Sequence, residues 1–402
     1  MWTDLFHRAM SRFIRDGALT IDYPDGTRRA YGDGSGPPVL MRITDPALLR
    51  EILLKPELAL GEGYVDGGWD LGEGTLADFF KVVLSNQRAG RLPKAMEVWG
   101  ALLRPAQKFI AHNRISAARA NVHHHYDLSG ALYDLFLDAD RQYSCAYFAR
   151  PDMTLEEAQE AKKHHIARKL RIEPGMRVLD IGCGWGGMAL TLARDYGAEV
   201  VGVTLSTEQL KVATERATAA GLGGRIDIRL QDYRELTGQF DRIVSVGMFE
   251  HVGLPHYGTY FGAVKRLMAP GGVALIHTIG VAGPPQATGE WIRRYIFPGG
   301  YLPSLSEVVR AIEKADLPIA DIEILRNHYG HTLRHWADRF EAHEDEAERL
   351  YDARFVRMWR YYLEASGASF FWGRNVNFQV QIEAPKGTVP ITRDYLYADA
   401  PA

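Results

Sequence analysis

The sequence predicts an α/β fold built around a parallel sheet, preceded by a smaller α+β domain. From about residue 155 onward, strand-like and helix-like segments alternate along the chain, whereas the first 120 residues show no such alternation. A glycine-rich turn at 182–187 follows a buried strand and precedes a helix. This is the arrangement expected at the carboxyl edge of a parallel sheet, where ligands bind.

Sequence signals place the elements of the parallel-sheet region. Thr154 is a helix N-cap residue with Glu156 and Glu157 in the following turn. Gly221 ends the helix that begins at Ser206. The predicted elements are strand 176–181, helix 188–196, strand 198–203, the helix from 206, strands 226–230 and 241–246, helix 257–268 and strand 272–279.

The N-terminal domain has weaker signals. Strand-like alternation at 19–23 and 39–43 flanks a loop rich in Gly and Pro. Glycines are frequent at 60–70, which predicts a segment that is not helical. Helices are predicted at 75–87 and 94–120.

Bulk composition limits the function classes. With 402 residues the chain is long enough for two or three domains. Its net charge of −3 argues against a nucleic-acid partner, which requires a broad positive surface. No apolar run approaches the roughly 18 residues of a membrane span, and the N-terminus lacks a signal-peptide pattern. We therefore expect a cytoplasmic protein whose contacts with lipid are peripheral.

Two regions have more than one interpretation. Residues 98–126 contain no acidic residue and carry Arg104, Lys108, Arg114 and Arg119 among apolar side chains. This stretch suits either an anionic membrane surface or a solvated helix that links two domains. Residues 286–378 are rich in Trp, Tyr and Phe, which indicates either ordinary core or an apolar tunnel.

The glycine turn is the first candidate binding site. Gly182, Gly184 and Gly186 alternate, and Asp180 precedes them by two residues. This spacing is tighter than the G-x-G-x-x-G fingerprint of dinucleotide-binding proteins. It suits a ligand with a carboxylate tail and no pyrophosphate, such as S-adenosylmethionine.

Further motifs identify a family. The chain carries YSCAYF at 143–148, VTLS at 203–206 followed by Gln209, GMFEH at 247–251, and HTI at 277–279. HYDL at 125–128 and YIFPGGYLPS at 295–304 accompany them. Together with the glycine turn, these motifs closely resemble the cyclopropane fatty acid synthases over essentially the whole chain.

The resemblance implies a fold and an activity. It implies a Rossmann-like class I methyltransferase domain at 121–402, with an acyl-chain pocket in the aromatic-rich part at 286–378. The domain at 1–120 would engage lipid or membrane, because relatives that act on phospholipids have this region. The expected reaction transfers a methyl group from S-adenosylmethionine to a cis double bond of a phospholipid acyl chain, and proton loss closes a cyclopropane ring. The alternative product is a methyl-branched or methylated unsaturated chain.

The resemblance also implies the catalytic residues. The base in this family is thought to be a bound bicarbonate. Its expected holders are Cys145, Glu250, His277, Tyr329 and the backbone of Ile279. Glu250 and His277 each follow a strand, so they are expected to converge at the carboxyl edge of the sheet. The chemistry needs no covalent enzyme intermediate, so Cys145 is expected to line an anion pocket and not to act as a nucleophile.

The cofactor site follows from the same resemblance. The three glycines are expected against the amino-acid part of S-adenosylmethionine, which Tyr143 and Ser144 would cover. No acidic residue ends the second strand, so Thr204 and Gln209 would take its place at the ribose. The full expected cofactor site consists of Tyr143, Ser144, Asp180, Gly182, Gly184, Gly186, Thr204, Gln209, Asp232 and Tyr233.

Three further expectations concern residues outside these motifs. Three consecutive histidines at 123–125 have no accompanying carboxylate or cysteine cluster, so no metal site is expected. Ser366 stands where many relatives carry a cysteine, which argues against a thiol role at that position. The protein is expected at the inner face of the membrane, and a homodimer is possible.

Overall fold

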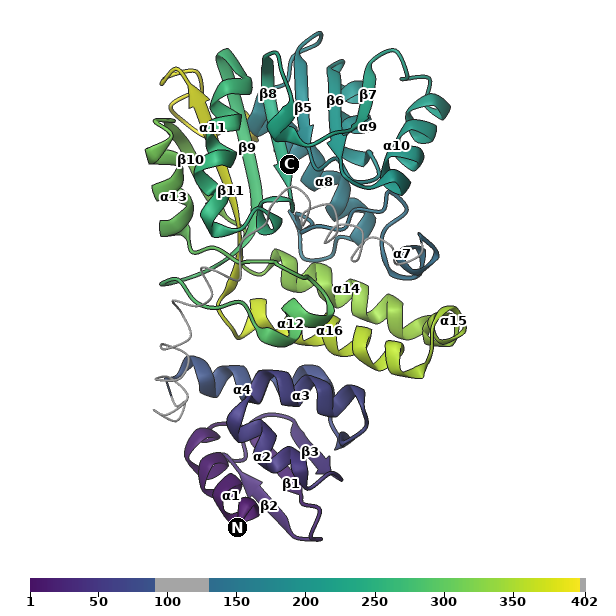
Figure 1. Cartoon of the computed structure of the whole chain (residues 1–402), viewed down its shortest axis with the longest axis vertical. Coiled ribbons are helices and arrows are strands. Elements are labelled where there is room, and N and C mark those ends of the chain that lie inside the picture. The colour runs from purple at the N-terminus through teal and green to yellow at the C-terminus, as the bar shows by residue number, and fades with distance from the viewer. Residues whose placement is uncertain (91–129, 398–402) are drawn as a thin grey trace. The chain divides into compact units, whose positions relative to one another are not determined.

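The computed structural model describes residues 1–90 and 130–397 (Figure 1). The chain forms two compact units. Unit 1 contains Met1–Gln107, Ala287–Pro298 and Gly330–Asn375, and unit 2 contains the remaining segments. The expected boundary at residue 120 and the basic stretch at 98–126 both lie outside the described residues. Unit 1 combines the N-terminal residues with Ala287–Pro298 and Gly330–Asn375, two segments that were expected in the methyltransferase domain.

Unit 2 is built on the predicted α/β sheet. Seven strands lie in the order β10-β11-β9-β8-β5-β6-β7. The pairs β5–β6, β5–β8, β6–β7 and β8–β9 are parallel, and β10 pairs antiparallel with β11. The strands are β5 (Arg177–Ile181), β6 (Glu199–Thr204), β7 (Ile226–Leu230), β8 (Phe240–Val246), β9 (Met268–Val281), β10 (Ile319–Ile324) and β11 (Asn375–Ala384). The strand order reverses between β5 and β8, which is where open α/β sheets bind ligands.

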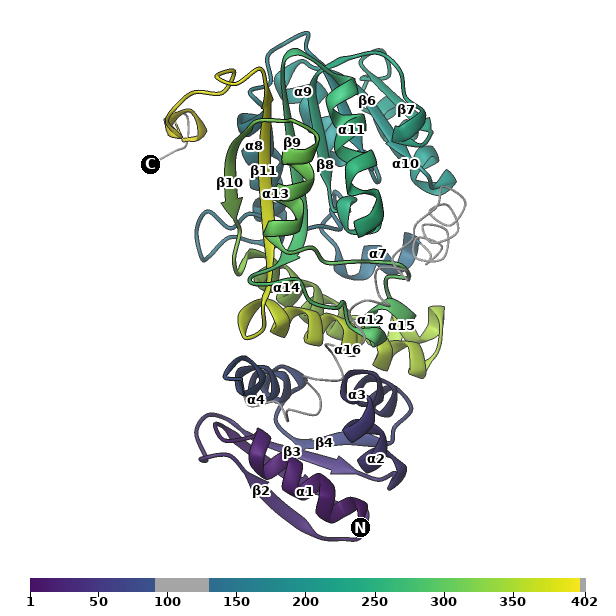
Figure 2. The same cartoon turned by 60° about the vertical axis from the view of Figure 1, so that its left-hand side comes forward.

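Helices cover both faces of this sheet (Figure 2). One core cluster packs α11 and α13 against the sheet through residues such as Leu179. A second cluster packs α8 and α9 through residues such as Val178. Because neighbouring strand residues point to opposite faces, the two clusters lie on opposite sides of β5. Among the described residues of unit 2, the helices with at least seven residues are α7 (Gly130–Phe136), α8 (Leu155–Leu170), α9 (Gly187–Tyr196), α10 (Thr207–Ala219), α11 (Tyr257–Leu267) and α13 (Leu305–Lys314).

Local signals explain where the helices begin. Thr154 accepts a hydrogen bond from the Glu157 N–H, and the Glu157 side chain accepts one from the Thr154 N–H, so α8 starts with a capping box. Ser206 caps α10 in a similar way by accepting from the Gln209 N–H. Both helix starts agree with the prediction.

Unit 1 contains the predicted α+β domain. Its sheet has the order β2-β1-β3-β4, in which β1 pairs antiparallel with β2 and parallel with β3. The predicted strands at 19–23 and 39–43 correspond to β1 and β3. The elements of the N-terminal segment are α1 (Trp2–Phe13), β1 (Ala18–Asp22), β2 (Arg28–Tyr31), β3 (Pro38–Ile43), α2 (Ala47–Leu54), α3 (Pro56–Val65), β4 (Trp69–Glu73) and α4 (Leu76–Arg88).

The prediction that 60–70 is not helical is wrong for its first half, because α3 runs through Val65. Its glycines allow close packing. A Cβ atom on Gly61 would lie 2.3 Å from the Trp291 ring, and one on Gly63 would lie 2.8 Å from Leu48. Tertiary packing therefore overrides the low helix propensity of glycine.

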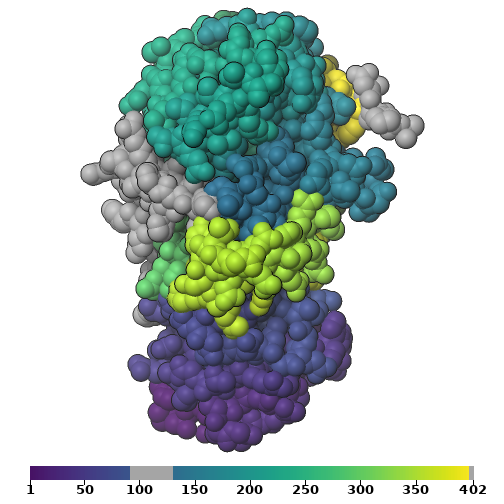
Figure 3. Space-filling model, turned by 90° about the vertical axis from the view of Figure 1, so that its right-hand side faces the viewer, coloured from purple at the N-terminus to yellow at the C-terminus, as the bar shows by residue number. Residues whose placement is uncertain are grey.

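Much of the aromatic-rich region, namely Ala287–Pro298 and Gly330–Asn375, belongs to unit 1. It contains α12 (Glu290–Tyr295), α14 (His328–Ala342), α15 (Glu344–Leu350) and α16 (Ala353–Phe371), and Figure 3 shows 330–371 as a continuous yellow-green band. Tyr361 packs against Trp291, Tyr64 and Phe80, with ring centroids 4.7, 5.7 and 5.2 Å away. At these positions the aromatic side chains are core. No helix in the described ranges is long and apolar enough to cross a membrane.

Candidate active site

The glycine turn joins β5 to α9 at the carboxyl edge of the sheet. Gly182, Gly184 and Gly186 have φ angles of +80°, +54° and +82°, a region that L side chains rarely adopt. The N–H groups of Gly182 and Cys183 donate to the Val203 carbonyl at 2.9 and 3.1 Å, which fixes the turn against β6. A Cβ atom on Gly184 would have no protein atom within 4 Å. The turn therefore presents open backbone at this position.

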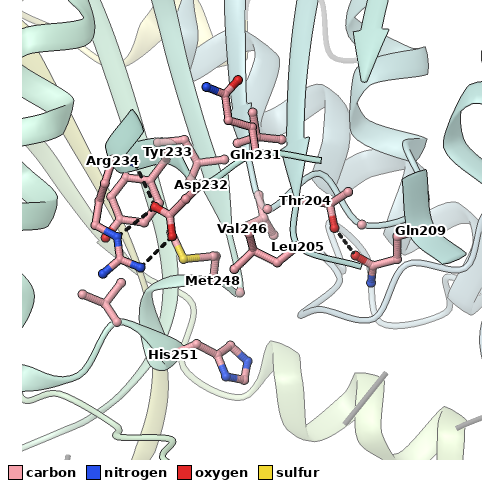
Figure 4. Close-up of a pocket in the computed structure, with 16 residues that line it drawn as sticks. Thr204, Leu205, Gln209, Gln231, Asp232, Tyr233, Arg234, Val246, Met248 and His251 are labelled. Atoms are coloured by element: carbon pink, nitrogen blue, oxygen red, sulfur yellow. Dashed lines mark hydrogen bonds and ion pairs between the residues drawn. The ribbon is translucent and has the colours of Figure 1, made fainter. Parts of the chain in front are cut away.

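A pocket of about 120 Å³ lies beside this turn (Figure 4). Residues at the carboxyl ends of β5, β6, β7 and β8 line it, as expected at a reversal of strand order. Six of the expected cofactor-site residues meet here: Gly182, Gly184, Thr204, Gln209, Asp232 and Tyr233. The rest of the lining consists of Ile181, Val203, Leu205, Gln231, Arg234, Val246, Gly247, Met248, His251 and Val252.

Neutral side chains occupy the end of β6, where the sequence has no acid. The Thr204 hydroxyl donates to Gln209 Oε1 at 2.8 Å, which leaves the Gln209 amide nitrogen to donate elsewhere (Figure 4). The N-cap bond at Ser206 fixes the helix that carries Gln209. The two side chains thus form a preorganised polar pair at the pocket.

The end of β7 carries an ion pair that the sequence did not indicate. Asp232 accepts from Arg234 Nε at 2.8 Å and from Nη2 at 2.6 Å, and its carboxylate is buried (Figure 4). The Arg234 guanidinium also lies over the Tyr233 ring, 5.6 Å from its centroid. Arg234 could have been found from its position four residues after a predicted strand that ends at Leu230. Asp232, which is expected to lie at the adenine of the cofactor, is therefore held in place by the Arg234 guanidinium.

The remaining expected cofactor residues lie around the pocket but do not line it. Asp180 is buried within β5, and its Oδ2 has no hydrogen-bond partner among the described residues. Burial raises the pKa of the Asp180 carboxyl to about 7.

Ser144 lies next to Gly247, because a Cβ atom on that glycine would be 4.0 Å from the Ser144 Cβ. Tyr143 packs on Tyr133, with ring centroids 5.4 Å apart. Gly186 packs against α10, where an added Cβ would lie 3.0 Å from Ala213.

Glu250 and Ile279 are brought together at the ends of β8 and β9. Glu250 Oε1 accepts the Ile279 N–H at 2.6 Å, so this carboxylate already uses the backbone donor of Ile279. The other oxygen, Oε2, is buried and has no partner among the described residues. Burial raises the pKa of Glu250 to about 7. The site therefore contains a buried carboxyl with one oxygen available to a ligand.

His277 is buried and held on both sides of its ring. Its Nε2 lies 2.9 Å from Asn377 and its Nδ1 lies 3.1 Å from Gln379, both on β11. Burial lowers the pKa of His277 well below its usual value, so the ring is neutral. A neutral imidazole has one donor and one acceptor nitrogen, so one of the two amides must present its oxygen to the ring. No sequence pattern indicated these partners on β11.

Cys145 and Tyr329 complete the expected set of catalytic residues. Cys145 is fully buried, its Sγ donates to the Ala146 carbonyl, and burial raises the pKa of the thiol. A thiol held in the neutral state is a poor nucleophile. Tyr329 is buried in the first turn of α14. The Gly247 N–H donates to the His277 carbonyl at 2.9 Å, which ties the pocket edge to β9.

The strand order, the glycine turn and the pocket beside it define a class I S-adenosylmethionine-dependent methyltransferase. Residues 113–380 match the family described as "Mycolic acid cyclopropane synthetase". The chain belongs to this family. Residues 5–90 match a "Domain of unknown function (DUF7884)".

Curated relatives extend this similarity over most of the chain. The chain is 42% identical to "Cyclopropane-fatty-acyl-phospholipid synthase" of Escherichia coli (strain K12), covering 83% of this chain and 85% of that protein. It is 38% identical to "Probable fatty acid methyltransferase" of Pseudomonas putida, covering 90% and 93%.

A solved structure shows the same fold. "Mycolic acid cyclopropane synthase CmaA1 complexed with SAH and CTAB" superimposes with a TM-score of 0.63 and 34% identity. The match covers 66% of this chain and 98% of that one. The protein is accordingly an enzyme of the S-adenosylmethionine-dependent methyltransferase class.

Proposed function

We propose that this enzyme transfers a methyl group from S-adenosylmethionine to a cis double bond of a phospholipid acyl chain and forms a cyclopropane ring. One observation carries the proposal. A buried carboxyl with an unpartnered oxygen, Glu250, lies directly beyond the strand whose end lines the methyltransferase pocket. A related protein bears the name cyclopropane-fatty-acyl-phospholipid synthase.

The pocket suits the parts of S-adenosylmethionine. The open backbone at Gly184 leaves room for the amino-acid part, and Ser144 lies at the edge that would cover it. Thr204 and Gln209 would hold the ribose hydroxyls, while Asp232 and Tyr233 would lie at the adenine. The bound cofactor supplies an electrophilic methyl group. The protein's task is to orient it and exclude water.

Glu250, His277 and the backbone of Ile279 form what we call the buried cluster, at the ends of β8 and β9. This cluster suits proton removal by a bound bicarbonate. Glu250 Oε2 is a buried oxygen that needs a hydrogen-bond donor, and a bicarbonate O–H would provide one. Cys145 and Tyr329 are the other holders that we propose. His277 and the Ile279 N–H are already engaged by protein groups, so we assign them the role of positioning the cluster.

A surface of unit 1 supports contact with an anionic phospholipid membrane. Exposed apolar side chains gather on α1 and α2, which contact each other. Arg50 lies over the Trp2 ring, 5.8 Å from its centroid, and so places a cation beside the apolar group. This α1–α2 face consists of Trp2, Leu5 and Leu54 with the exposed Arg8, Arg12 and Arg50. Apolar side chains flanked by arginines match the interfacial zone of an anionic bilayer.

Lipid analysis tests the reaction. Cells that express the protein should accumulate phospholipids whose acyl chains carry a cyclopropane ring, with upfield methylene protons in the NMR spectrum. Mass spectrometry after hydrogenation and NMR together separate this ring from a methyl branch and from a methylated alkene. Methylated chains without ring protons would favour the alternative product, and the name of the Pseudomonas putida relative is compatible with that outcome. Unmodified acyl chains would refute both.

Vesicle sedimentation tests the membrane surface. Changing Trp2, Leu5 and Leu54 together to Ser should weaken binding to vesicles that contain phosphatidylglycerol. Ile391→Ser is the matched control, because Ile391 is another exposed apolar residue, located in unit 2. Unchanged binding by the triple variant would refute the role of the α1–α2 face.

A further inference from the structure

Helix α8 anchors the segment that lies at the edge of the cofactor pocket. Gln159 Nε2 donates to the Ser144 carbonyl at 2.9 Å and to the Gln142 carbonyl at 3.2 Å. One turn further along the same helix, Lys162 Nζ donates to Gln142 Oε1 at 2.6 Å and to Ser144 Oγ at 2.7 Å. Two side chains of α8 thus hold both the backbone and the side chains of Gln142 and Ser144.

Lys162 is an unusual lysine in its surroundings. It is 0% exposed, and it makes no ion pair with a carboxylate of the described residues, although Asp138 and Asp140 interact with it electrostatically at longer range. The adjacent Lys163 is also buried, but it pairs with Asp140 and Glu160 at 2.7 Å each. Burial lowers the pKa of Lys162 to about 8. Burying an ammonium group without a direct counter-ion is costly, so a further anionic partner would offset that cost.

The hydrogen bonds of Lys162 determine how Ser144 is used. An ammonium group only donates, so Ser144 Oγ must accept from it. The Ser144 O–H is then left to donate to another group. Lys162 fixes the Gln142 amide in the same way, because Oε1 accepts from the ammonium while Nε2 donates to Asp140 Oδ2 at 3.0 Å.

Ser144 lies where this donor can reach the pocket. The residue keeps 8% of its surface exposed, and it adjoins Gly247, which lines the pocket. The buried Asp180, with its unpartnered Oδ2, belongs to the strand that leads into the glycine turn. The ammonium of Lys162 interacts electrostatically with this carboxyl. The surroundings of the turn therefore contain a buried cation, Lys162, and a buried acid, Asp180, neither of which forms an ion pair among the described residues.

We propose that Lys162 is a positioning residue that fixes the Ser144 hydroxyl as a donor to the carboxylate of the cofactor's amino-acid part, so that the site selects ligands with this anionic tail. This inference rests on the proposed placement of S-adenosylmethionine in the pocket. Removal of the ammonium frees Ser144 to rotate and removes the positive charge behind it. Affinity for a ligand with the carboxylate should fall, while affinity for a ligand without it should not.

Calorimetry with two ligands tests this inference. S-adenosylhomocysteine carries the amino-acid part, and 5′-methylthioadenosine has the same nucleoside without it. Lys162→Met should weaken S-adenosylhomocysteine binding about tenfold or more, the scale of a hydrogen bond to a charged group. Binding of 5′-methylthioadenosine should stay within about twofold. Equal weakening of both ligands, or of neither, would overturn the proposal.

Variants of Ser144 keep the test decisive if Lys162→Met does not fold. Ser144→Ala should give the same selective loss, and Ser144→Thr, which keeps the hydroxyl, should restore most of the affinity. In a folded Lys162→Met protein, adding Ser144→Ala should cause little further loss, because both changes remove one coupled interaction. Fully additive losses would contradict the coupling. If the unaltered protein binds neither ligand, the proposed cofactor site is wrong; a non-selective loss overturns only the role of Lys162.

Discussion

The pocket at the glycine turn and the buried cluster at the ends of β8 and β9 use different means of recognition. The pocket offers open backbone at Gly184 and a neutral polar pair, Thr204 and Gln209. The cluster contains Glu250 and His277, whose pKa values are shifted in opposite directions by burial. Backbone geometry suits tight binding of a fixed ligand, whereas buried titratable groups suit proton transfer. Substitutions in the pocket should therefore change affinity, and those in the cluster should change turnover.

The largest expected effect is at Glu250. Glu250→Gln should lower turnover by roughly 100-fold or more, the scale of a positioned proton-transfer group. Cofactor affinity should stay within a few-fold, because Glu250 does not line the pocket. Steady-state kinetics and calorimetry on the same preparation measure both quantities. A near-normal rate would remove Glu250 from the catalytic cluster.

His277→Ala sharpens the distinction within the cluster. It should also lower turnover, but in addition it leaves the Asn377 and Gln379 amides without their ring partner. A buried polar group left unpaired costs about 1–3 kcal/mol, so the free energy of unfolding should fall by this order. Urea unfolding measures this change in the free energy of unfolding. Glu250→Gln is the comparison, since glutamine can still accept the Ile279 N–H. Equal stability of the two variants would contradict the assigned positioning role of His277.

A substitution in the glycine turn should lower cofactor affinity, whereas the substitutions in the buried cluster should lower turnover. Gly184→Val adds a branched side chain at φ +54°, in space that is open in the protein. We expect cofactor affinity to fall at least about tenfold, equivalent to about 1.4 kcal/mol. Calorimetry with S-adenosylhomocysteine checks it, and circular dichroism confirms that the variant is folded. Unchanged affinity in a folded protein would separate this turn from the cofactor site.

The buried acid of β5 should affect stability in a pH-dependent way. The pKa of Asp180 is about 7 in the folded protein and 3.8 in the reference state, so the folded protein holds a proton that the unfolded chain releases. The free energy of unfolding should therefore fall as pH rises from about 4 to 7. The Asp180→Asn variant has no carboxyl at this position, so its free energy of unfolding does not fall for this reason as the pH rises. Without cofactor, its stability relative to the unaltered protein should improve by more than about 1 kcal/mol between pH 5 and 8, since one pKa unit corresponds to 1.36 kcal/mol.

Denaturant titrations at the two pH values measure this difference. The comparison of the two proteins cancels the other titrating groups, such as His277, that both contain. A pH-independent difference would show that Asp180 is ionised in the folded state and has a partner.

The smallest expected effect is at Ser366, in the C-terminal half of α16 and in unit 1. Its backbone carbonyl accepts from the Ser369 hydroxyl, an interaction that survives removal of its own side-chain oxygen. Ser366→Ala should leave kcat and KM within about twofold, as expected for a residue outside catalysis. A tenfold loss would extend the active site to α16.

Much of the fold was predictable because its signals are local. The capping sequence at Thr154, the glycine turn and the alternation of β5 to β9 lie within short windows, so these elements were predicted within a few residues. The short strands β2 and β4 were missed, because four or five residues carry little periodicity. Helix α3 was missed because its glycines are explained only by packing partners distant in the sequence.

The sequence by itself determined the class of fold, the family and the strand ends at which polar residues gather. Only the tertiary structure decided what those residues do to one another. It joined Glu250 to the Ile279 N–H and enclosed His277 between two amides of β11. It also buried Lys162 against Ser144, 18 residues earlier in the chain. Burial and hydrogen bonding set the charge and direction of a polar group, and both depend on elements that the chain brings together only when it folds.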